Sequence, residues 1–449
     1  MHHPARNLAA TLLALALFAA AGRAADDKKY DTPSAPLVPE VWRTTAKSPL
    51  QPGEIDRLLD RELRGAGVTP APRTTDEQFI RRLSLDLTGR PPTPEQVSNF
   101  VANKAPDKRA RLIDRLLDSD AYARQQARYW REVLLARATA TQVFLRLARA
   151  PALERWLYEQ FKANRPWAEI ARALVTAEGG LDYGNPDKAN GAAAFLLCHI
   201  GPGAADERAA DTARIFLGIQ LQCAQCHNHP TDVWKRDQFH ELAAFYGRTR
   251  ERLRRDGMMV NVSLGSSFVG EHRMPDLNRP GRSTLKNPRF LAGAALPEGR
   301  PDEARRQALA DALTSRDNYW FAAAYVNRLW GELLGQSFYQ PVDDMGPLKE
   351  AHFPAVLARL AAGLQASDYD TKQIARAVLN SAAYQRQVRL GKATDEHLQF
   401  AAAYPARLKA EALWASLAQA LGPLEPPRPM MRRPGPMAGP LARFRTFQF

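Results

Sequence analysis

The chain has 449 residues, of which 45% are hydrophobic and 24% are charged, and its formal net charge is +14. This composition excludes a disordered chain, and three cysteines are too few for a disulfide framework. The positive charge is spread over segments that also carry Asp and Glu, such as residues 54–57 and 107–109, and no basic motif is interleaved with aromatic residues. We therefore expect a solvated basic surface that suits an acidic protein or a polyanionic polymer, and not a nucleic acid.

Residues 1–24 have the organisation of a secretory signal peptide. An apolar run at residues 8–21 follows Arg6. Gly22 and Ala24, the outer residues of the next triplet, are small, as a cleavage site requires. The run is short for a membrane span, and no later stretch reaches that length. We expect cleavage near Ala24 and an exported protein of the periplasm or cell envelope, without a transmembrane segment.

Residues 25–50 are polar and rich in proline, which indicates an extended lead-in. Residues 51–250 then show apolar positions three or four apart, the pattern of amphipathic helices. Capping boxes are expected where Thr75 precedes Gln78 and where Thr93 precedes Gln96. The apolar faces consist of Ile55, Leu58, Leu59 and Leu63; Phe79, Ile80, Leu83 and Leu87; Leu112, Ile113, Leu116 and Leu117; Tyr129, Trp130, Val133 and Leu134; Leu153, Trp156, Leu157 and Phe161; and Ile170 with Leu174.

The middle of the chain contains a glycine-rich segment and a polar, basic segment, with an expected helix between them. Residues 179–191 are rich in glycine and predict a loop, whereas residues 209–221 predict a helix that begins at Asp211 or Thr212. Residues 251–285 are polar and basic, with an alternating stretch at residues 260–264 that favours a short strand.

Helix patterns return from residue 286 and continue to about residue 420. They predict helices at residues 302–314, 318–334, 352–366 and 370–383. Residues 421–449 are rich in Pro, Arg and Met without periodicity, which indicates a flexible tail. The expected fold is mainly α and multi-helical, with two helical domains, at residues 51–250 and 286–420, separated by a small extended or β insert.

One motif carries specific chemistry. Cys223-Ala224-Gln225-Cys226-His227 is a c-type haem attachment sequence. Two thiols on one turn can add to the two vinyl groups of a porphyrin, and the adjacent imidazole can reach the iron. The sequence therefore predicts covalent haem c, with Cys223 and Cys226 as anchors and His227 as the proximal ligand.

Two other interpretations of the cysteines stay open. Cys223 and Cys226 could form a redox disulfide, although this leaves His227 without a task. A tetrahedral zinc site could instead draw four ligands from Cys198, His199, Cys223, Cys226, His227 and His229. Cys198 also follows three apolar residues, which favours a buried position.

The sixth ligand of the iron is not readable from the sequence. Methionine raises the potential, histidine lowers it, and an open position permits small-ligand chemistry. Met345 is the candidate distal ligand, because its turn between Asp343-Asp344 and Gly346-Pro347 predicts exposure, while His229 could line the haem edge with Trp234 or bind a metal. The remaining candidates are Met258, Met259, Met274, His240 and His272.

Long segments resemble two planctomycete cytochrome-like families. Residues 79–95, 107–109, 112–117 and 129–130 resemble the DUF1549 domain, which ends on a Cys-x-x-Cys-His-x-His motif matched by residues 223–229. Positions in the second half resemble the DUF1553 domain: 318, 320–321, 326–330, 335, 341–344, 379–381 and 383–385. The resemblance implies an exported protein of cytochrome-like type.

Two polar groups within the second region have structural interpretations. Asn327, Arg328 and Trp330 share a helix, which favours helix packing. Asp343 and Asp344 stand in a proline-flanked turn, which favours a turn and cap over a cation site.

Two functions compete at this point. The first is a monohaem c-type protein for electron transfer or an oxidoreductase step, with an unidentified redox partner. The second is a non-enzymatic binding or scaffold protein with a structural Cys/His zinc site. A hydrolase lacks a readable nucleophile or carboxylate pair.

Overall fold

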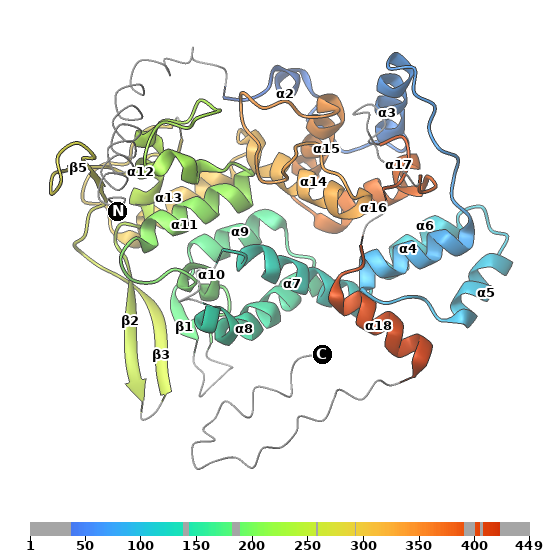
Figure 1. Ribbon diagram of the computed structural model, residues 1–449, viewed down its shortest axis with the longest axis horizontal. Helices are drawn as coiled ribbons and strands as arrows, with labels where there is room; N and C mark the ends of the chain where they lie inside the picture. Colours follow the sequence, from blue (N-terminus) through green and yellow to red (C-terminus); the bar gives the residue numbers. More distant parts are fainter. Residues whose placement is uncertain are drawn as a thin grey trace, which may run out of the picture.

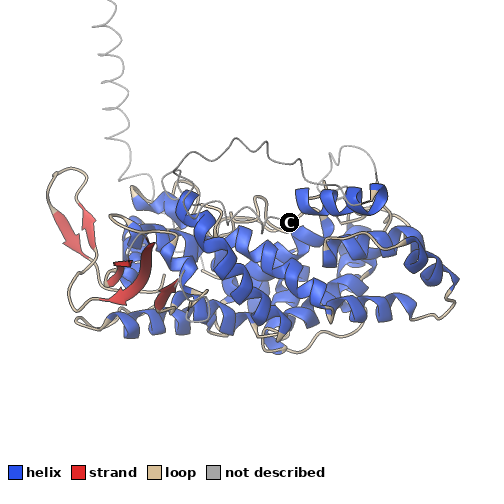
Figure 2. Ribbon diagram, turned by 90° about the horizontal axis from the view of Figure 1, so that it is seen from below, coloured by secondary structure: helices blue, strands red, loops and turns tan. Residues whose placement is uncertain are grey.

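The computed structural model describes residues 37–137, 143–181, 189–256, 259–291, 293–389, 400–404 and 407–422. The protein is built mainly from α-helices, as the sequence predicts, and its small sheets lie at one end (Figure 2). The expected signal peptide and nearly all of the expected tail lie outside the described residues. Within those residues, no helix is long and apolar enough to cross a membrane.

Helices dominate the chain up to the first strand, and their starts follow the capping residues. Thr93 begins its helix with a complete capping box, in which Gln96 N–H donates to Thr93 Oγ1 at 3.2 Å and Thr93 N–H donates to Gln96 Oε1 at 2.9 Å. At Thr75 the expected box is only half formed, because the Gln78 side chain turns to the Thr74 hydroxyl. The helices are α2 (Glu40–Thr44), α3 (Glu54–Gly65), α4 (Asp76–Thr88), α5 (Pro94–Ala102), α6 (Lys108–Leu117), α7 (Asp120–Leu134), α8 (Val143–Lys162) and α9 (Trp167–Val175).

The prediction of an extended segment at residues 25–50 is wrong in part, since helix α2 lies within it. Trp42 on this helix is buried and contacts the ring of Tyr319, with ring centroids 5.0 Å apart. Aromatic burial of this kind outweighs the polar, proline-rich composition from which a lead-in was expected.

Short helical pieces connect α9 to the middle of the chain. They are α10 (Ala193–Leu197), α11 (Ala204–Thr212), the π-helix η3 (Ala213–Leu217), the 3₁₀-helix η4 (Leu221–Gln225), α12 (Arg236–Ala243) and the 3₁₀-helix η5 (Ala244–Tyr246). The expected helix at 209–221 is therefore wrong in its start: α11 begins after Gly203, and Asp211 and Thr212 lie in its last turn. Both residues are buried and serve tertiary contacts instead of capping.

The insert contains the one short strand that the alternation at residues 260–264 predicts, and two further strands pair with it. β2 (Thr249–Asp256) pairs antiparallel with β3 (Met259–Ser266), and β3 also pairs with β1 (Gly179–Leu181), which gives the order β1-β3-β2. The loop expected from residue 179 is thus a strand at its start. A second, two-stranded sheet joins β4 (Arg273–Pro275) to β5 (Ser283–Leu285).

The second helical region is organised around one buried helix. Helix α14 is buried on nearly all sides, from Tyr319 to Leu334, which is the pattern of a central helix. The helices of this region are α13 (Asp302–Thr314), α14 (Tyr319–Leu334), α15 (Pro354–Ala366), α16 (Thr371–Asn380), α17 (Ala382–Gln385) and α18 (Ala410–Leu421).

The two helical regions share one hydrophobic core. A single cluster of buried residues runs from Trp42 to Ala401, and it contains α4, α7, α9, α11, α14, α15 and α16 side chains. Helices α3 and α6 of the first region pack against α15 and α16 of the second. Figure 1 shows the blue and orange helices side by side, with β2 and β3 at the far end from α4, α5 and α6. The expectation of two helical domains therefore becomes two sequence regions in one packed body.

Candidate functional site

The Cys-x-x-Cys-His segment, for which the sequence predicts haem attachment, lies on a sharp turn after η3. Gly218 ends η3 in the left-handed conformation, with φ of +70°, a conformation that glycine adopts without penalty. Its carbonyl accepts from the backbone N–H of Met345 at 2.8 Å. A Cβ on Gly218 would lie 2.3 Å from Met345 Sδ, so glycine is required here on two grounds.

Cys223, Cys226 and His227 are all exposed around η4. Neither thiol is in a disulfide, and Ala224 between them is fully buried and anchors the turn. His227 Nδ1 lies 2.7 Å from the carbonyl oxygen of Asn228, which holds the ring and leaves Nε2 as the outer nitrogen. This donor set, two open thiols and one oriented imidazole, fits covalent haem.

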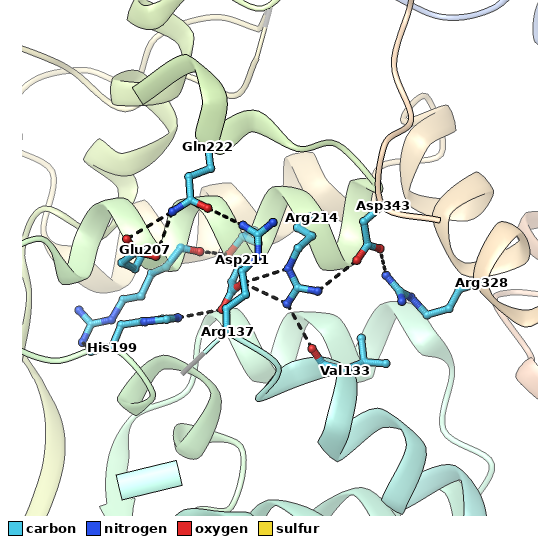
Figure 3. A network of polar contacts seen from close by, with 11 residues as sticks. Val133, Arg137, His199, Glu207, Asp211, Arg214, Gln222, Arg328 and Asp343 are labelled. Carbon is cyan, nitrogen blue, oxygen red and sulfur yellow. Dashed lines mark hydrogen bonds and ion pairs between the residues drawn. The ribbon is translucent and has the colours of Figure 1, made fainter. Parts of the chain in front are cut away.

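The two glutamines of the turn fix it to the neighbouring helices. Gln222 Nε2 lies 3.4 Å from both carboxylate oxygens of Glu207 on α11, and its Oε1 accepts from Arg137 Nη1 at 2.6 Å (Figure 3). The Gln225 carbonyl accepts from Arg236 Nε at 3.2 Å and lies 3.0 Å from His240 Nε2, both on α12. These contacts hold the turn against the neighbouring helices, while both of its thiols are exposed.

His240 and His272, two of the sixth-ligand candidates, contact each other. His240 Nδ1 lies 2.9 Å from His272 Nε2, and the two rings are stacked at 5.2 Å. Burial lowers the pKa of each to about 4, so both imidazoles are neutral at pH 7. Met274 lies on β4 and Met259 is the first residue of β3, whereas Met258 is outside the described residues.

The predicted exposure of Met345 is wrong. Its side chain is 1% exposed and packs against Gly218, because the turn folds onto the chain before η4. His229 is also buried: its ring Nδ1 accepts from Thr231 N–H at 3.3 Å, and its backbone N–H donates to the Trp234 carbonyl at 2.8 Å. Burial lowers the His229 pKa. His229 and Trp234 thus stabilise the loop from inside.

The ligand set of the zinc alternative is not assembled. Cys198 and His199 are buried, and no three of the six residues proposed for it, all of them described, bring ligand atoms within 4.8 Å of one another. His199 Nε2 instead lies 2.8 Å from Asp211 Oδ2. A zinc site built from these cysteines and histidines would need the chain to rearrange.

A chain of polar contacts, most of them between buried side chains, links the two regions (Figure 3). From His199 it continues through Asp211 to Arg214, whose Nη2 lies 3.0 Å from Asp211 Oδ1. Arg214 Nη1 then donates to Asp343 Oδ2 at 3.2 Å, and Arg328 Nη2 donates to Asp343 Oδ1. These ion pairs fix η3, and hence the approach to η4, to the second region.

Opposing effects act on the pKa of the Asp211 carboxyl in this chain of polar contacts. Burial alone would raise its pKa, but the hydrogen bond from His199 and the charge of Arg214 outweigh burial and lower it. Asp211 is therefore ionised at neutral pH.

Asn327 positions the Asp343 loop. Its side chain is fully buried, Nδ2 donates to the Val342 carbonyl at 3.0 Å, and Oδ1 accepts from Tyr339 N–H at 2.9 Å. Asn327 was expected to serve helix packing. Its amide also fixes the loop before Asp343 through these two hydrogen bonds. The expected turn is present, since Asp344 N–H donates to the Pro341 carbonyl at 3.0 Å, but Asp343 serves as an ion-pair partner rather than as a cap.

Comparisons with known proteins agree with the resemblance seen in the sequence. Residues 54–251 match the PSCyt2 family, described as a protein of unknown function (DUF1549), and residues 305–439 match the PSD1 family, described as a protein of unknown function (DUF1553). The chain therefore carries a DUF1549 region followed by a DUF1553 region. No curated protein and no solved structure matches it.

Proposed function

We propose that this chain is an exported c-type monohaem protein that transfers electrons, or serves an oxidoreductase step, in the periplasm or cell envelope. Cys223 and Cys226 would be the thioether anchors, and His227 would be the proximal ligand. The PSCyt2 match supports the coarse, cytochrome-like character of the chain, because the matched residues 54–251 include this motif.

One observation carries the proposal. Both thiols of the motif are exposed on a single turn whose imidazole already has its inner nitrogen engaged. An imidazole with Nδ1 bonded to a backbone carbonyl presents Nε2 as the metal-binding atom, and the bonded partner fixes the orientation of the ring. Attachment therefore requires no movement of the buried core.

When bound, haem supplies one-electron chemistry, with a potential set by its axial ligands and their surroundings. The chain's own residues hold the attachment turn rigid: Gln222 contacts α11, and the Gln225 carbonyl contacts α12. The net charge of +14 would favour a redox partner with an acidic contact surface.

The test is expression of the full chain in a host with haem-maturation machinery. We expect a coloured protein that keeps its haem after acid–acetone extraction and whose mass includes one haem. The variant Cys223→Ser/Cys226→Ser should be colourless, whereas Cys198→Ala, which removes the third cysteine, should keep one haem per chain. His227→Ala should keep the haem but change its spectrum.

A colourless wild-type chain of unmodified mature mass, from cells that load a control cytochrome, would overturn the proposal. Retention of covalent haem by the double serine variant would overturn the assignment of the anchors.

A further inference from the structure

We propose that the chain holds a second metal centre, a divalent transition-metal ion bound by Asp206 Oδ1, His240 Nδ1 and His272 Nε2. The three ligands come from three separate segments: α11, α12 and the residue immediately before β4. Within the described residues, this is the one group of three or more His, Cys, Asp or Glu side chains whose ligand atoms all lie within 4.8 Å of one another.

The distances between the three ligand atoms suit one ion. His240 Nδ1 and His272 Nε2 are 2.9 Å apart, and Asp206 Oδ1 lies 3.4 Å from His272 Nε2 and 3.9 Å from His240 Nδ1. Ligands placed tetrahedrally about 2.0–2.1 Å from zinc are separated by about 3.3–3.4 Å. The observed distances bracket this value, so small side-chain shifts bring all three atoms into the coordination sphere.

A plain histidine pair explains only part of this arrangement. A hydrogen bond between the rings satisfies His240 Nδ1 and His272 Nε2, but it leaves Asp206 Oδ1 buried without a hydrogen-bond partner. A buried carboxylate oxygen without a partner is costly. A cation between the three atoms satisfies the oxygen and both nitrogens together.

The surroundings orient the ligands as in known metal sites. His240 Nε2–H points to the Gln225 carbonyl at 3.0 Å, and this fixes Nδ1 as the nitrogen with the free lone pair. Gly247 permits the close approach of the third ligand, since a Cβ there would lie 3.0 Å from the His272 backbone nitrogen. Metal-ligating histidines commonly bond a backbone carbonyl through their second nitrogen in this way.

The ligand set indicates the kind of ion. Two imidazoles and one carboxylate suit zinc or iron(II) rather than calcium or magnesium, which prefer oxygen ligands. Three protein ligands leave a fourth position for water or a small ligand, as in catalytic zinc sites. The side chains of His240 and His272 are 3% and 9% exposed, and that of Asp206 is 19% exposed, so access is from the Asp206 side.

The site is tested on the full-length chain in the Cys223→Ser/Cys226→Ser background, so that neither haem iron nor thiolates contribute. After treatment with a chelator, the protein is titrated with zinc by calorimetry and with cobalt(II) by visible absorption. We expect one equivalent of each ion, a cobalt spectrum of nitrogen and oxygen ligands, and a higher melting temperature with zinc.

Matched variants locate the ion. Loss of a group that only hydrogen-bonds to a metal ligand costs about 10–100-fold in metal affinity. Asp206→Asn and His272→Gln remove ligands themselves, so each should weaken zinc binding by more than that. Asp237→Asn, an exposed carboxyl on α12, and His352→Gln, a half-buried histidine outside the cluster, should bind as the parent does.

Two results would overturn the site. One is the absence of saturable zinc or cobalt binding in the folded parent chain. The other is unchanged affinity in both ligand variants, with folding checked by circular dichroism. Because the anchoring cysteines are absent from every chain tested, failure of haem attachment leaves this result unaffected, and the reverse also holds.

Discussion

Replacement of Asp343 by Asn should destabilise the protein by breaking the link between the two sequence regions. The carboxylate of Asp343 is shared by Arg214, at 3.2 Å, and Arg328, and the two arginine side chains are only 6% and 8% exposed. Asparagine keeps the shape but not the charge, so two buried guanidinium groups lose a counter-ion. Breaking a buried ion pair by removing one partner costs about 3–5 kcal/mol.

The structure places the expected cost at the lower end of that range, at about 3 kcal/mol. Arg214 keeps Asp211 and the Val133 carbonyl as partners, whereas Arg328 loses its carboxylate and already has a buried Nε without a partner. The neighbouring Asp344 provides a matched control. Its single ion pair with Lys349, at 3.3 Å, is between two partly exposed side chains, so Asp344→Asn should cost about 0–1 kcal/mol.

Urea unfolding of the wild type and both variants measures these costs as differences in midpoint at an unchanged denaturant slope. A cost for Asp343→Asn no larger than that for Asp344→Asn would show that the shared carboxylate does not stabilise two buried charges. An altered slope in Asp343→Asn alone would indicate instead that the two regions unfold separately.

Two further changes test other parts of the structure. Gly218→Ala should cost about 2–5 kcal/mol in urea unfolding, since a left-handed Cβ costs about 1–2 kcal/mol and its overlap with Met345 Sδ about 1–3 kcal/mol; a loss below 1 kcal/mol would contradict this packing. Asp86→Asn should stabilise the protein at pH 7.5 but not at pH 4. Burial raises the pKa of Asp86 to about 6 from about 3.9 for a free carboxyl, so the protonated form favours folding at low pH and this contribution is lost as the pH rises through 6. At about 1.4 kcal/mol for each pKa unit, the gain in stability is at most about 3 kcal/mol. Melting temperatures of the wild type and the variant at the two pH values measure this gain. An equal gain at both pH values would contradict the prediction.

Local patterns predicted most of the helices. The helix expected at 302–314 is α13 to the residue, because Pro301 and the acidic first turn mark its start within the sequence itself. The strand expected around Val262 and Leu264 is β3, where both side chains are buried. These features depend on neighbours a few positions away, which is the range that periodicity and capping can read.

Tertiary contacts account for the features that the sequence did not predict. Asp211 has the residue type of a helix cap, but its carboxylate contacts His199 and Arg214, and such partners leave no mark in a local pattern. Met345 stands in a polar turn that nevertheless folds onto Gly218. In each case a long-range contact determines the position of a side chain whose neighbours in sequence indicate otherwise.

The residues of the candidate sites also divide into those that are close in the sequence and those that only the tertiary structure brings together. The proposed attachment residues are contiguous in the sequence, so the motif alone is enough to place them on one turn. The His240 and His272 pair was not predicted, although both residues were named singly as ligand candidates. Their convergence with Asp206 depends on the chain returning from β3 to the start of β4 beside α11 and α12, and only a three-dimensional arrangement reveals it.

Gln225 connects the turn at residues 221–227 to the pair of His240 and His272, and a separate prediction follows from this contact. Its carbonyl lies 3.0 Å from His240 Nε2, the nitrogen that faces away from His272. His240→Ala removes one net hydrogen bond, worth about 1 kcal/mol, from the turn, which corresponds to about fivefold faster local opening. We expect that increase in hydrogen exchange of a peptide covering residues 221–227, measured in metal-free protein without haem. His272→Gln leaves the bond to Gln225 in place and should exchange as the parent does, so equal exchange in the two variants would show that His240 does not hold the turn.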